Sequence, residues 1–348
     1  MGSSGVRGSR VSPLSVAGWV GLAVLLVGAF IAALGALNQT VYGSSSFIER
    51  YLSAIANDDI AEAATTPGVA LDDAELAALG LPANVSTAML RTGVIESGPE
   101  DVTIMSDVAR ADGTHTVTAS YRLADAIVQS SFDVRPIEPL YGVLNRWEFA
   151  VSPLAVIDVT AAHNPTFTVG SLTLDARALK SGDELAAFTQ VTPYIAIAPA
   201  VYEFSYSSEL LEAVPVTLQA DASTRTAVTV DAQPTPAFVE RVQFKVDDFL
   251  SKCAAQPVLQ PAECPFGIEI DDRVTGEPEW SIISSPQVTL TPGESSFDMP
   301  PTEGVAHITV EVQSLFDGHY YTLDEDRPFT LALSATITPD DTIDIQLK

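Results

Sequence analysis

An uncharged apolar stretch near the N-terminus constrains this chain more than any other feature. Residues 13–37 read PLSVAGWVGLAVLLVGAFIAALGAL and carry no charged side chain. As a helix the stretch would be roughly 36 Å long, which exceeds the ~30 Å hydrocarbon core of a bilayer. The sequence therefore predicts one transmembrane helix over residues 13–37, with the membrane as a partner of the chain.

The charges on either side of this stretch predict its orientation. Arg7 and Arg10 precede it, and the first charge after it is Glu49. The positive-inside rule then predicts a cytoplasmic tail over residues 1–12 and an extracytoplasmic bulk, in a single-pass protein of the cell membrane. A cleaved signal peptide is the alternative, with Ala33-Leu34-Gly35 as a small-x-small site. The apolar run is longer than the usual 7–15 residues of a signal peptide, which favours an uncleaved anchor and leaves cleavage untested.

Small residues recur along the apolar stretch. Gly21, Gly28 and Gly35 follow one another at seven-residue intervals. Such a stripe would let two membrane helices approach closely, which suggests a weak homodimer through this face. We prefer the simpler interpretation that these glycines reflect how common glycine is in membrane helices.

The charge balance limits the partners of the chain. It has 348 residues with 45 acidic and 17 basic side chains, a formal net charge of −28. This balance repels nucleic acid and anionic lipid headgroups, so no nucleic-acid partner is expected. A hydrophobic content of 47% is typical of globular chains rather than disordered ones, and the length suits two or three domains.

The chain has two cysteines, Cys253 and Cys264, both on the predicted outer side. Outside the cytosol, two cysteines this close predict one structural disulfide. A redox-active pair would favour Cys-x-x-Cys spacing, and no histidine lies between them to complete a metal site.

Periodicity divides the ectodomain into three segments. Residues 44–153 begin with the capping-box pattern Ser46-Phe47-Ile48-Glu49 and an amphipathic helix. Short helical patches are expected next and then antiparallel strands, an order that predicts an α+β domain of the NTF2-like type. The expected patches are Asp58–Ala64, Asp72–Leu79 and Val85–Leu90, and the expected strands are Val102–Ser106, Thr114–Arg122, Ile127–Val134 and Leu144–Val151.

Residues 154–232 predict a small β-sandwich, and residues 233–348 a second α+β domain with the disulfide. Thr235-Pro236 is an N-cap and N1 pair for a helix whose apolar face runs from Phe238 to Cys253. The predicted fold class is therefore α+β and mostly β, with two helix-plus-antiparallel-sheet, NTF2-like domains flanking a small sandwich. Strands expected in the last segment are Gly267–Ile270, Trp280–Ile283, Gln287–Leu290, His307–Val312, Tyr320–Leu323, Phe329–Ile337 and Thr342–Leu347.

Two short matches suggest an internal duplication of the first and third segments. Phe47-Ile48-Glu49-Arg50 corresponds to Phe238-Val239-Glu240-Arg241, and Trp147 and Trp280 are each followed by Ser-Pro at the same offset. The interval from helix to tryptophan differs greatly between them, so the duplication stays a hypothesis.

This layout resembles that of extracytoplasmic, membrane-anchored multidomain proteins of Gram-positive, actinobacterial-type bacteria. The TcaA-like proteins, with NTF2-like and PEGA-like modules, are the nearest named group. The shared features are the uncharged anchor, the Phe-[Ile/Val]-Glu-Arg helix, the Trp…Ser-Pro strand and a β unit with a turn at Pro199. A zinc-ribbon cysteine set before the anchor is missing, and Pro199-Ala200 stands where Pro-Gly is usual. The resemblance implies sensing or scaffolding in the envelope and transfers no catalytic residue.

The search for chemistry finds no catalytic, metal or cofactor motif, so no cofactor and no metal are predicted. His115, His163, His307 and His319 are scattered singly and are interpreted as ordinary strand or loop residues. Acidic clusters are expected mostly at solvated turns, where Asp caps backbone donors, with a Ca²⁺ site as the alternative. These clusters are Asp72-Asp73, Asp271-Asp272, Asp324-Glu325-Asp326 and Asp340-Asp341 with Asp344.

Three functions are compatible with the predicted anchor and ectodomain. The first is a non-enzymatic, membrane-anchored protein that binds envelope proteins or glycans or scaffolds a complex. The second is a carboxylate-dependent cell-wall hydrolase or transferase, for which two carboxylates would have to face each other in a concave pocket. The third is a passive, membrane-tethered spacer.

Overall fold

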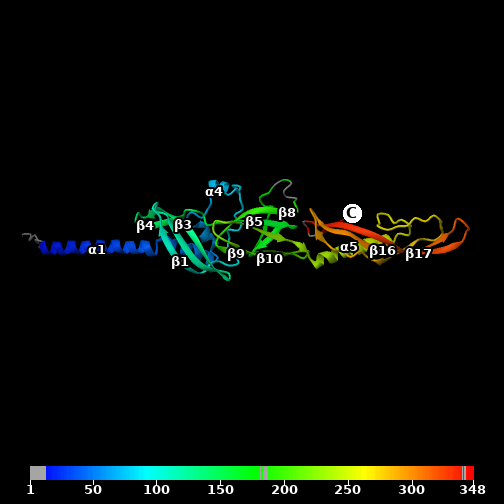
Figure 1. The fold of residues 1–348 in the computed structure, drawn as a ribbon, viewed down its shortest axis with the longest axis horizontal. Helices are drawn as coiled ribbons and strands as arrows, with labels where there is room; N and C mark the ends of the chain where they lie inside the picture. The colour runs from blue at the N-terminus through cyan, green and yellow to red at the C-terminus, as the bar shows by residue number, and fades with distance from the viewer. Residues whose placement is uncertain (1–12, 181, 183–186, 339, 341) are drawn as a thin grey trace, which may run out of the picture. The chain divides into compact units, whose positions relative to one another are not determined.

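The structure is a computed structural model that describes residues 13–180, 182, 187–338, 340 and 342–348. It has one N-terminal apolar helix and a mostly β body built from four sheets (Figure 1). The chain packs as two compact units. Unit 1 comprises residues 1–157, 194–202 and 219–226, and unit 2 comprises residues 158–193, 203–218 and 227–348. The predicted three-way domain division stays a prediction.

Helix α1 (Pro13–Thr40) contains the apolar stretch and continues three residues beyond its predicted end. The segment Trp19–Thr40 has a mean hydropathy of 2.6 and is long and apolar enough to cross a membrane. By length and composition it fits either a membrane anchor or a signal sequence. Arg7 and Arg10 lie outside the described residues, so the orientation stays a prediction.

Unit 1 contains the first helix-plus-sheet region. Helix α2 (Ser44–Ala56) packs its apolar face against a four-stranded antiparallel meander in the order β1-β2-β3-β4. The face comprises the residues predicted from periodicity: Phe47, Ile48, Tyr51, Leu52 and Ile55 are all buried. The remaining elements are α3 (Ile60–Thr65), α4 (Asp73–Ala78), β1 (Glu100–Ala109), β2 (His115–Leu123), β3 (Ala126–Leu140) and β4 (Leu144–Phe149).

Two sheets follow in the chain, one of five strands and one of three. The five-stranded sheet has the order β12-β10-β9-β6-β7, and the three-stranded sheet has the order β11-β5-β8. The predicted turn at Pro199 lies between β8 and β9. The strands are β5 (Ala155–Ala162), β6 (Thr166–Val169), β7 (Leu172–Asp175), β8 (Thr189–Ala196), β9 (Ala200–Ser207), β10 (Leu211–Ala220), β11 (Arg225–Asp231) and β12 (Gln233–Pro234).

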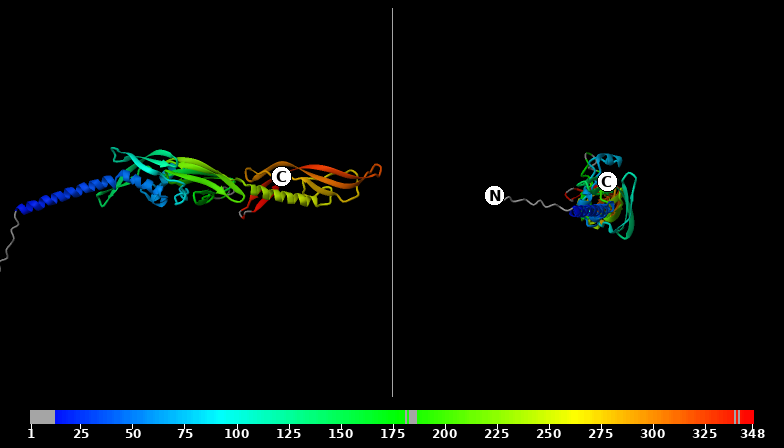
Figure 2. Two further views of the ribbon diagram at one scale, coloured as in Figure 1. Left: turned by 90° about the horizontal axis from the view of Figure 1, so that it is seen from below. Right: turned by 90° about the vertical axis from the view of Figure 1, so that its left-hand side faces the viewer.

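Unit 2 contains the second helix-plus-sheet region. Helix α5 (Pro236–Ala254) starts where predicted: the Thr235 hydroxyl accepts from the Phe238 amide, and Pro236 is the first helical residue. Figure 2 (left) shows this yellow helix along the orange ribbon formed by the longest strands, β16 (Phe297–Gln313) and β17 (Tyr320–Ile337). The other strands are β13 (Arg273–Val274), β14 (Glu279–Ser284), β15 (Thr291–Pro292) and β18 (Ile343–Leu347).

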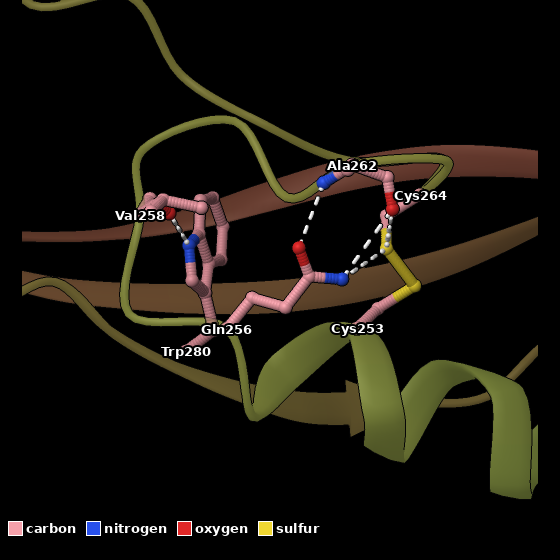
Figure 3. The surroundings of a disulfide bond; sticks show 6 residues. All are labelled: Cys253, Gln256, Val258, Ala262, Cys264 and Trp280. Atoms are coloured by element: carbon pink, nitrogen blue, oxygen red, sulfur yellow. Dashed lines mark hydrogen bonds between the residues drawn. A yellow bond between two sulfur atoms is a disulfide. The ribbon is translucent and has the colours of Figure 1, made fainter.

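The predicted disulfide joins Cys253, in the last turn of α5, to Cys264 (Figure 3). The loop between them is also closed by the Gln256 side chain, whose amide accepts from the Ala262 backbone amide and donates to the Ala262 carbonyl oxygen. The indole of Trp280 donates to the Val258 carbonyl oxygen at 2.8 Å. A covalent bond and side-chain hydrogen bonds therefore hold the loop against β14.

Two local predictions for unit 1 are wrong. The capping box Ser46–Glu49 does not form, because α2 begins at Ser44 after Gly43 and the Ser46 hydroxyl donates to the Thr40 carbonyl oxygen. The expected helix at Val85–Leu90 is absent, and Ser86 instead forms a β-bridge with Tyr194. At Ser46 a neighbouring carbonyl oxygen replaces the capping interaction, and at Ser86 a strand partner far along the chain replaces the helical hydrogen bonds.

The acidic cluster Asp324-Glu325-Asp326 was expected at a turn and lies instead within β17. This strand is continuous, and its register against β16 places Asp326 opposite His307 and Asp324 opposite Thr309. Two expected strands, Gly267–Ile270 and Gln287–Leu290, have no strand geometry. The paired backbone of the long ribbon determines the conformation here in spite of the low strand propensity of Asp.

The two helix-plus-sheet regions have different sheet topologies. The sheet under α2 is a four-stranded meander, whereas the sheet of unit 2 has the path β13-β16-β17-β18 with β14 and β15 also paired to β16. The duplication therefore remains a hypothesis based on short sequence matches.

Candidate functional site

The junction between α1 and α2, residues 38–43, is tied to the first sheet by side chains. The Asn38 amide nitrogen donates to the Val143 carbonyl oxygen at 2.8 Å, and its oxygen accepts from the Asn145 backbone amide at 3.0 Å. The Trp147 indole donates to the Tyr42 carbonyl oxygen, and the Arg50 guanidinium donates to that of Val41. Residues 38–43 are thus held in place by the β3–β4 hairpin and α2.

A cavity of about 420 Å³ opens beside this junction. It is enclosed by α2, α3, the turn after α3 and the β3–β4 hairpin, all within unit 1. Its lining combines aromatic rings, two guanidinium groups, one carboxylate and several small polar groups. The lining residues are Tyr42, Phe47, Arg50, Tyr51, Glu62, Thr65, Thr66, Pro67, Leu140, Asn145, Arg146 and Trp147.

The wall formed by the turn after α3 is held close to β4. The Phe149 amide donates to the Pro67 carbonyl oxygen at 3.0 Å. Gly68 has a positive φ of 77°, and a Cβ at this position would overlap the backbone of Phe149. A glycine is therefore required where the two backbones approach, and the approach brings Thr65 and Thr66 to the rim of the cavity.

The charges of the cavity are unusual for such an acidic chain. Arg50 and Arg146 are exposed, and neither guanidinium forms an ion pair with a carboxylate in the part of the chain that the structure describes. Glu62 is the one carboxylate in the lining, and its recorded hydrogen bonds involve its backbone only. Guanidinium groups can hold a carboxylate or phosphate by paired hydrogen bonds, so the cavity can accept an anionic group.

A polar cluster lies behind Trp147. The Asp107 carboxylate accepts from the hydroxyls of Ser44 and Ser45, the first residues of α2, and lies 2.5 Å from Nδ1 of His115. The His115 ring contacts the Trp147 ring edge-on at 4.7 Å between centroids. Burial acts to raise the pKa of Asp107, but these hydrogen bonds outweigh it and hold that pKa below its usual value.

The Ser44, His115 and Asp107 side chains do not have the arrangement of a catalytic triad. In a triad, the serine and the carboxylate bind opposite nitrogens of the imidazole. Here both groups lie at Nδ1, with Ser44 Oγ at 3.2 Å, and the serine donates directly to the carboxylate. The cluster instead places a negative charge at the N-terminus of α2, which stabilises the helix there.

Tyr51 connects the cavity floor to the turn at Pro199. Its ring lines the cavity, and its hydroxyl donates to the Ala198 carbonyl oxygen at 2.6 Å. Burial raises the pKa of Tyr51 well above its usual value, and the nearby Tyr202 adds to this effect. The hydroxyl therefore remains protonated and acts as a structural donor.

The acidic clusters found in the sequence do not meet in a cavity. Among the four cavities described, the carboxylates that appear in the linings are Glu62 in the first, Asp133 in the third and Glu75 in the fourth, and the second has none. Asp72 caps α4 in a capping box with Glu75, and Asp272 accepts from the Tyr321 hydroxyl. Asp341 lies outside the described residues.

The remaining histidines lie apart from this cavity. His163 Nδ1 is 2.7 Å from Asp231, and His307 lies between Asp326 at 2.8 Å and Asp324 at 3.3 Å. The amide of His319 donates to Asp317 in the β16–β17 turn. Among the described residues, no group of three or more His, Cys, Asp or Glu side chains has an arrangement that could hold a metal ion.

The site residues predicted from sequence lie elsewhere. Cys253 and Cys264 form the disulfide of unit 2, and Gly21, Gly28 and Gly35 lie on α1 with open space around each. The cavity residues were missed as a set, because α2, α3 and β4 contribute them from distant parts of the sequence. The available signals are Phe47-Ile48-Glu49-Arg50 and the Trp147 strand, which in the sequence suggest duplication and an envelope-protein layout rather than a binding site.

Comparison of this chain with protein families, with curated proteins and with solved structures finds no match, so the residues themselves carry the functional argument.

Proposed function

We propose that this chain is a single-pass, extracytoplasmic membrane protein whose ectodomain binds an envelope component without chemical turnover. The observation that carries the proposal is the cavity beside the α1–α2 junction, with its aromatic lining and the two guanidinium groups of Arg50 and Arg146. The proposed orientation, with a cytoplasmic N-terminus, rests on Arg7 and Arg10.

The composition of the lining favours an anionic saccharide as the ligand. Arg146 offers a planar set of donors to a carboxylate or phosphate. The Thr65 hydroxyl can donate to or accept from a sugar hydroxyl, and the Glu62 carboxylate can accept from one. The partly exposed ring of Tyr42 provides apolar surface for the face of a sugar. At about 420 Å³, the cavity falls in the usual range for small-ligand sites and would hold one or two sugar units.

A carboxylate-dependent hydrolase remains the alternative. Such an enzyme needs two carboxyl groups roughly 5–9 Å apart across the scissile bond. The cavity supplies Glu62 alone, which favours binding over glycoside hydrolysis. Turnover of an oligosaccharide by the wild-type chain, abolished in Glu62→Gln, would replace the binding proposal with the enzymatic one.

The finer fold assignment belongs to the same proposal. We assign residues 44–153 to an NTF2-like domain because α2 covers one face of a curved antiparallel meander and a cavity opens between helix and sheet. The likeness to TcaA-like envelope proteins rests on the sequence features alone and also implies a binding or scaffolding role. The disulfide of unit 2 agrees with an extracytoplasmic location.

Binding of defined saccharides to the full chain in nanodiscs tests this function. We expect a uronic-acid oligosaccharide or a sugar phosphate to bind, and Arg146→Ala to weaken that binding by about tenfold or more, since a charged hydrogen bond contributes roughly 1.5–3 kcal/mol. The neutral saccharide of the same length should bind more weakly than the anionic one.

Arg135→Ala is the matched control. Arg135 lies on β3, opposite Glu148 on β4, and its guanidinium pairs with that carboxylate at 2.6 Å without lining the cavity. Equal losses in the two variants would show that net charge rather than the cavity determines binding. No binding of either anionic probe would leave the passive spacer as the better account.

A further inference from the structure

The tip of the β3–β4 hairpin carries an exposed apolar cluster beside the end of α1. Leu140, Tyr141 and Val143 are 39%, 86% and 48% exposed. Within residues 138–146, which read EPLYGVLNR, one acidic and one basic side chain flank an uncharged run of seven residues. In a chain with 45 acidic residues, such a run at the tip of a turn is a distinct surface.

The hydrogen bonds of the junction define the direction in which this tip points. Along β4, Trp147 binds Tyr42, while Asn145 and Val143 bind Asn38. The hairpin segment from Trp147 back to Val143 therefore lies alongside the segment from Tyr42 back to Asn38. The hairpin tip follows Val143 in this direction, and Figure 1 shows β3 and β4 next to the end of α1.

The apolar part of α1 begins directly at this level. The uncharged apolar run ends at Leu37, one residue before Asn38. Leu34, one helical turn further into the run, is half-buried, whereas the rest of the segment from Trp19 to Leu37 is exposed. The tip therefore lies at the border between the apolar helix and the polar ectodomain.

We propose that the β3–β4 hairpin tip is a second membrane contact, in which Leu140, Tyr141 and Val143 enter the interfacial layer of the outer leaflet. This inference rests on the proposed function, because it requires α1 to span the bilayer. A tyrosine with an apolar ring and a polar hydroxyl suits the headgroup region, where aromatic residues concentrate. With Glu138 and Arg146 balancing each other, the contact is apolar and does not require anionic lipid.

Such a contact would fix the cavity relative to the bilayer. Leu140 and Arg146 belong both to the hairpin and to the cavity lining, so the cavity would open close to the membrane surface. Its ligand would then be the membrane-proximal part of an envelope component.

Lipid-dependent quenching on the full chain tests the inference. The two native cysteines form a disulfide, so one introduced cysteine can be labelled with a fluorophore. Tyr141→Cys reports on the tip, and Leu26→Cys reports on the middle of α1. Asp125→Cys is the matched control, since it lies at the β2–β3 turn, at the other end of the 15-residue strand β3 and about 50 Å away.

In phosphatidylcholine vesicles that contain spin-labelled lipid, we expect Leu26→Cys to be strongly quenched and Tyr141→Cys to be quenched about twofold more than Asp125→Cys, as fits insertion of roughly 5–10 Å. Adding Asn38→Ala should reduce the quenching at Tyr141→Cys, because it breaks the tie between hairpin and α1. Quenching that Asn38→Ala leaves unchanged would contradict the role of the junction.

The possible failures are distinguishable. Quenching of Leu26→Cys together with equal, low quenching at Tyr141→Cys and Asp125→Cys would overturn the hairpin contact and leave the anchor intact. An unquenched Leu26→Cys would overturn the anchor itself, and the hairpin contact with it.

Discussion

Helices α2 and α5 look alike in sequence and are held in place in different ways. Both present an amphipathic face to an antiparallel sheet, and each region has a tryptophan whose indole donates to a backbone carbonyl. Trp147 binds Tyr42, before its helix, whereas Trp280 binds Val258, after its helix. In the region of α2 the indole hydrogen bond therefore holds the start of the helix, next to α1. In the region of α5 it holds the segment after the helix, next to the disulfide.

This difference bears on function. The α2 helix is held by hydrogen bonds from the sheet, and a cavity opens beside its first turns, while α5 carries its own N-cap and packs on a large buried core. Under the proposed function the region of α2 would hold the ligand, and proteins give up some packing consistency at functional sites. The following experiments test this difference between the two regions.

The largest expected effect concerns the first aromatic residue of each helix. Phe238→Ala should destabilise unit 2 by about 4 kcal/mol, because Phe238 is fully buried and packs against Phe297. Phe47→Ala should cost less, about 3 kcal/mol, because its ring already borders a cavity. Hydrogen exchange of α2 and α5 amides would measure each loss separately. A larger loss for Phe47→Ala would contradict the expected difference between the two rings.

The disulfide should have the next largest effect. Replacing Cys253 and Cys264 with alanine should lower the free energy of unfolding of unit 2 by about 2–3 kcal/mol, since the bond closes a short loop in the unfolded chain. Hydrogen exchange of the α5 amides measures this loss. The amides of α2 serve as the internal control, and their exchange rates should not change. Unchanged protection around α5 would show that Gln256 and Trp280 hold the loop without the covalent bond.

A smaller effect separates the two helix starts. Thr235→Ala should cost about 1 kcal/mol through loss of the N-cap of α5. Glu49→Gln should change stability by less than about 0.5 kcal/mol, because the Ser46–Glu49 capping box does not form. Thermal unfolding of the two variants would compare them directly. A loss of similar size in Glu49→Gln would restore the capping box predicted from the sequence.

The smallest effect is a pH dependence at the start of α2. The pKa of Asp107 in the folded chain is held below its usual value, so its contribution to stability is fully present above about pH 4 and is lost as the pH falls through the folded pKa. At acidic pH the α2 amides should lose part of their protection against hydrogen exchange, and Asp107→Asn should make this loss smaller. Hydrogen exchange at several pH values measures this, and an unchanged profile would assign the acid sensitivity to other carboxylates.

Several parts of the fold were predictable because their signals are local. The apolar run of α1, the apolar faces of α2 and α5, the Thr235-Pro236 start and the four strands of the first sheet all follow from short-range periodicity or capping. The disulfide followed from two cysteines with no competing partner. Each of these features depends on residues within about twenty positions of one another, which is the range over which sequence patterns are informative.

The cavity and the position of the hairpin tip beside α1 lay beyond such reasoning. Asn38 and Val143 are 105 positions apart, and so are Tyr42 and Trp147, so no periodicity connects them. The error at residues 85–90 has the same cause, because Ser86 pairs with the distant Tyr194. The error at Asp324 comes from cross-strand pairing with β16, which overrides the local turn propensity of Asp. Hydrophobic and capping patterns thus determined which segments form helices and strands, while tertiary contacts determined how long β17 runs and which side chains face the cavity. The physical reason is that local patterns constrain the backbone one turn or strand at a time, whereas a site is made where segments from different parts of the chain come together.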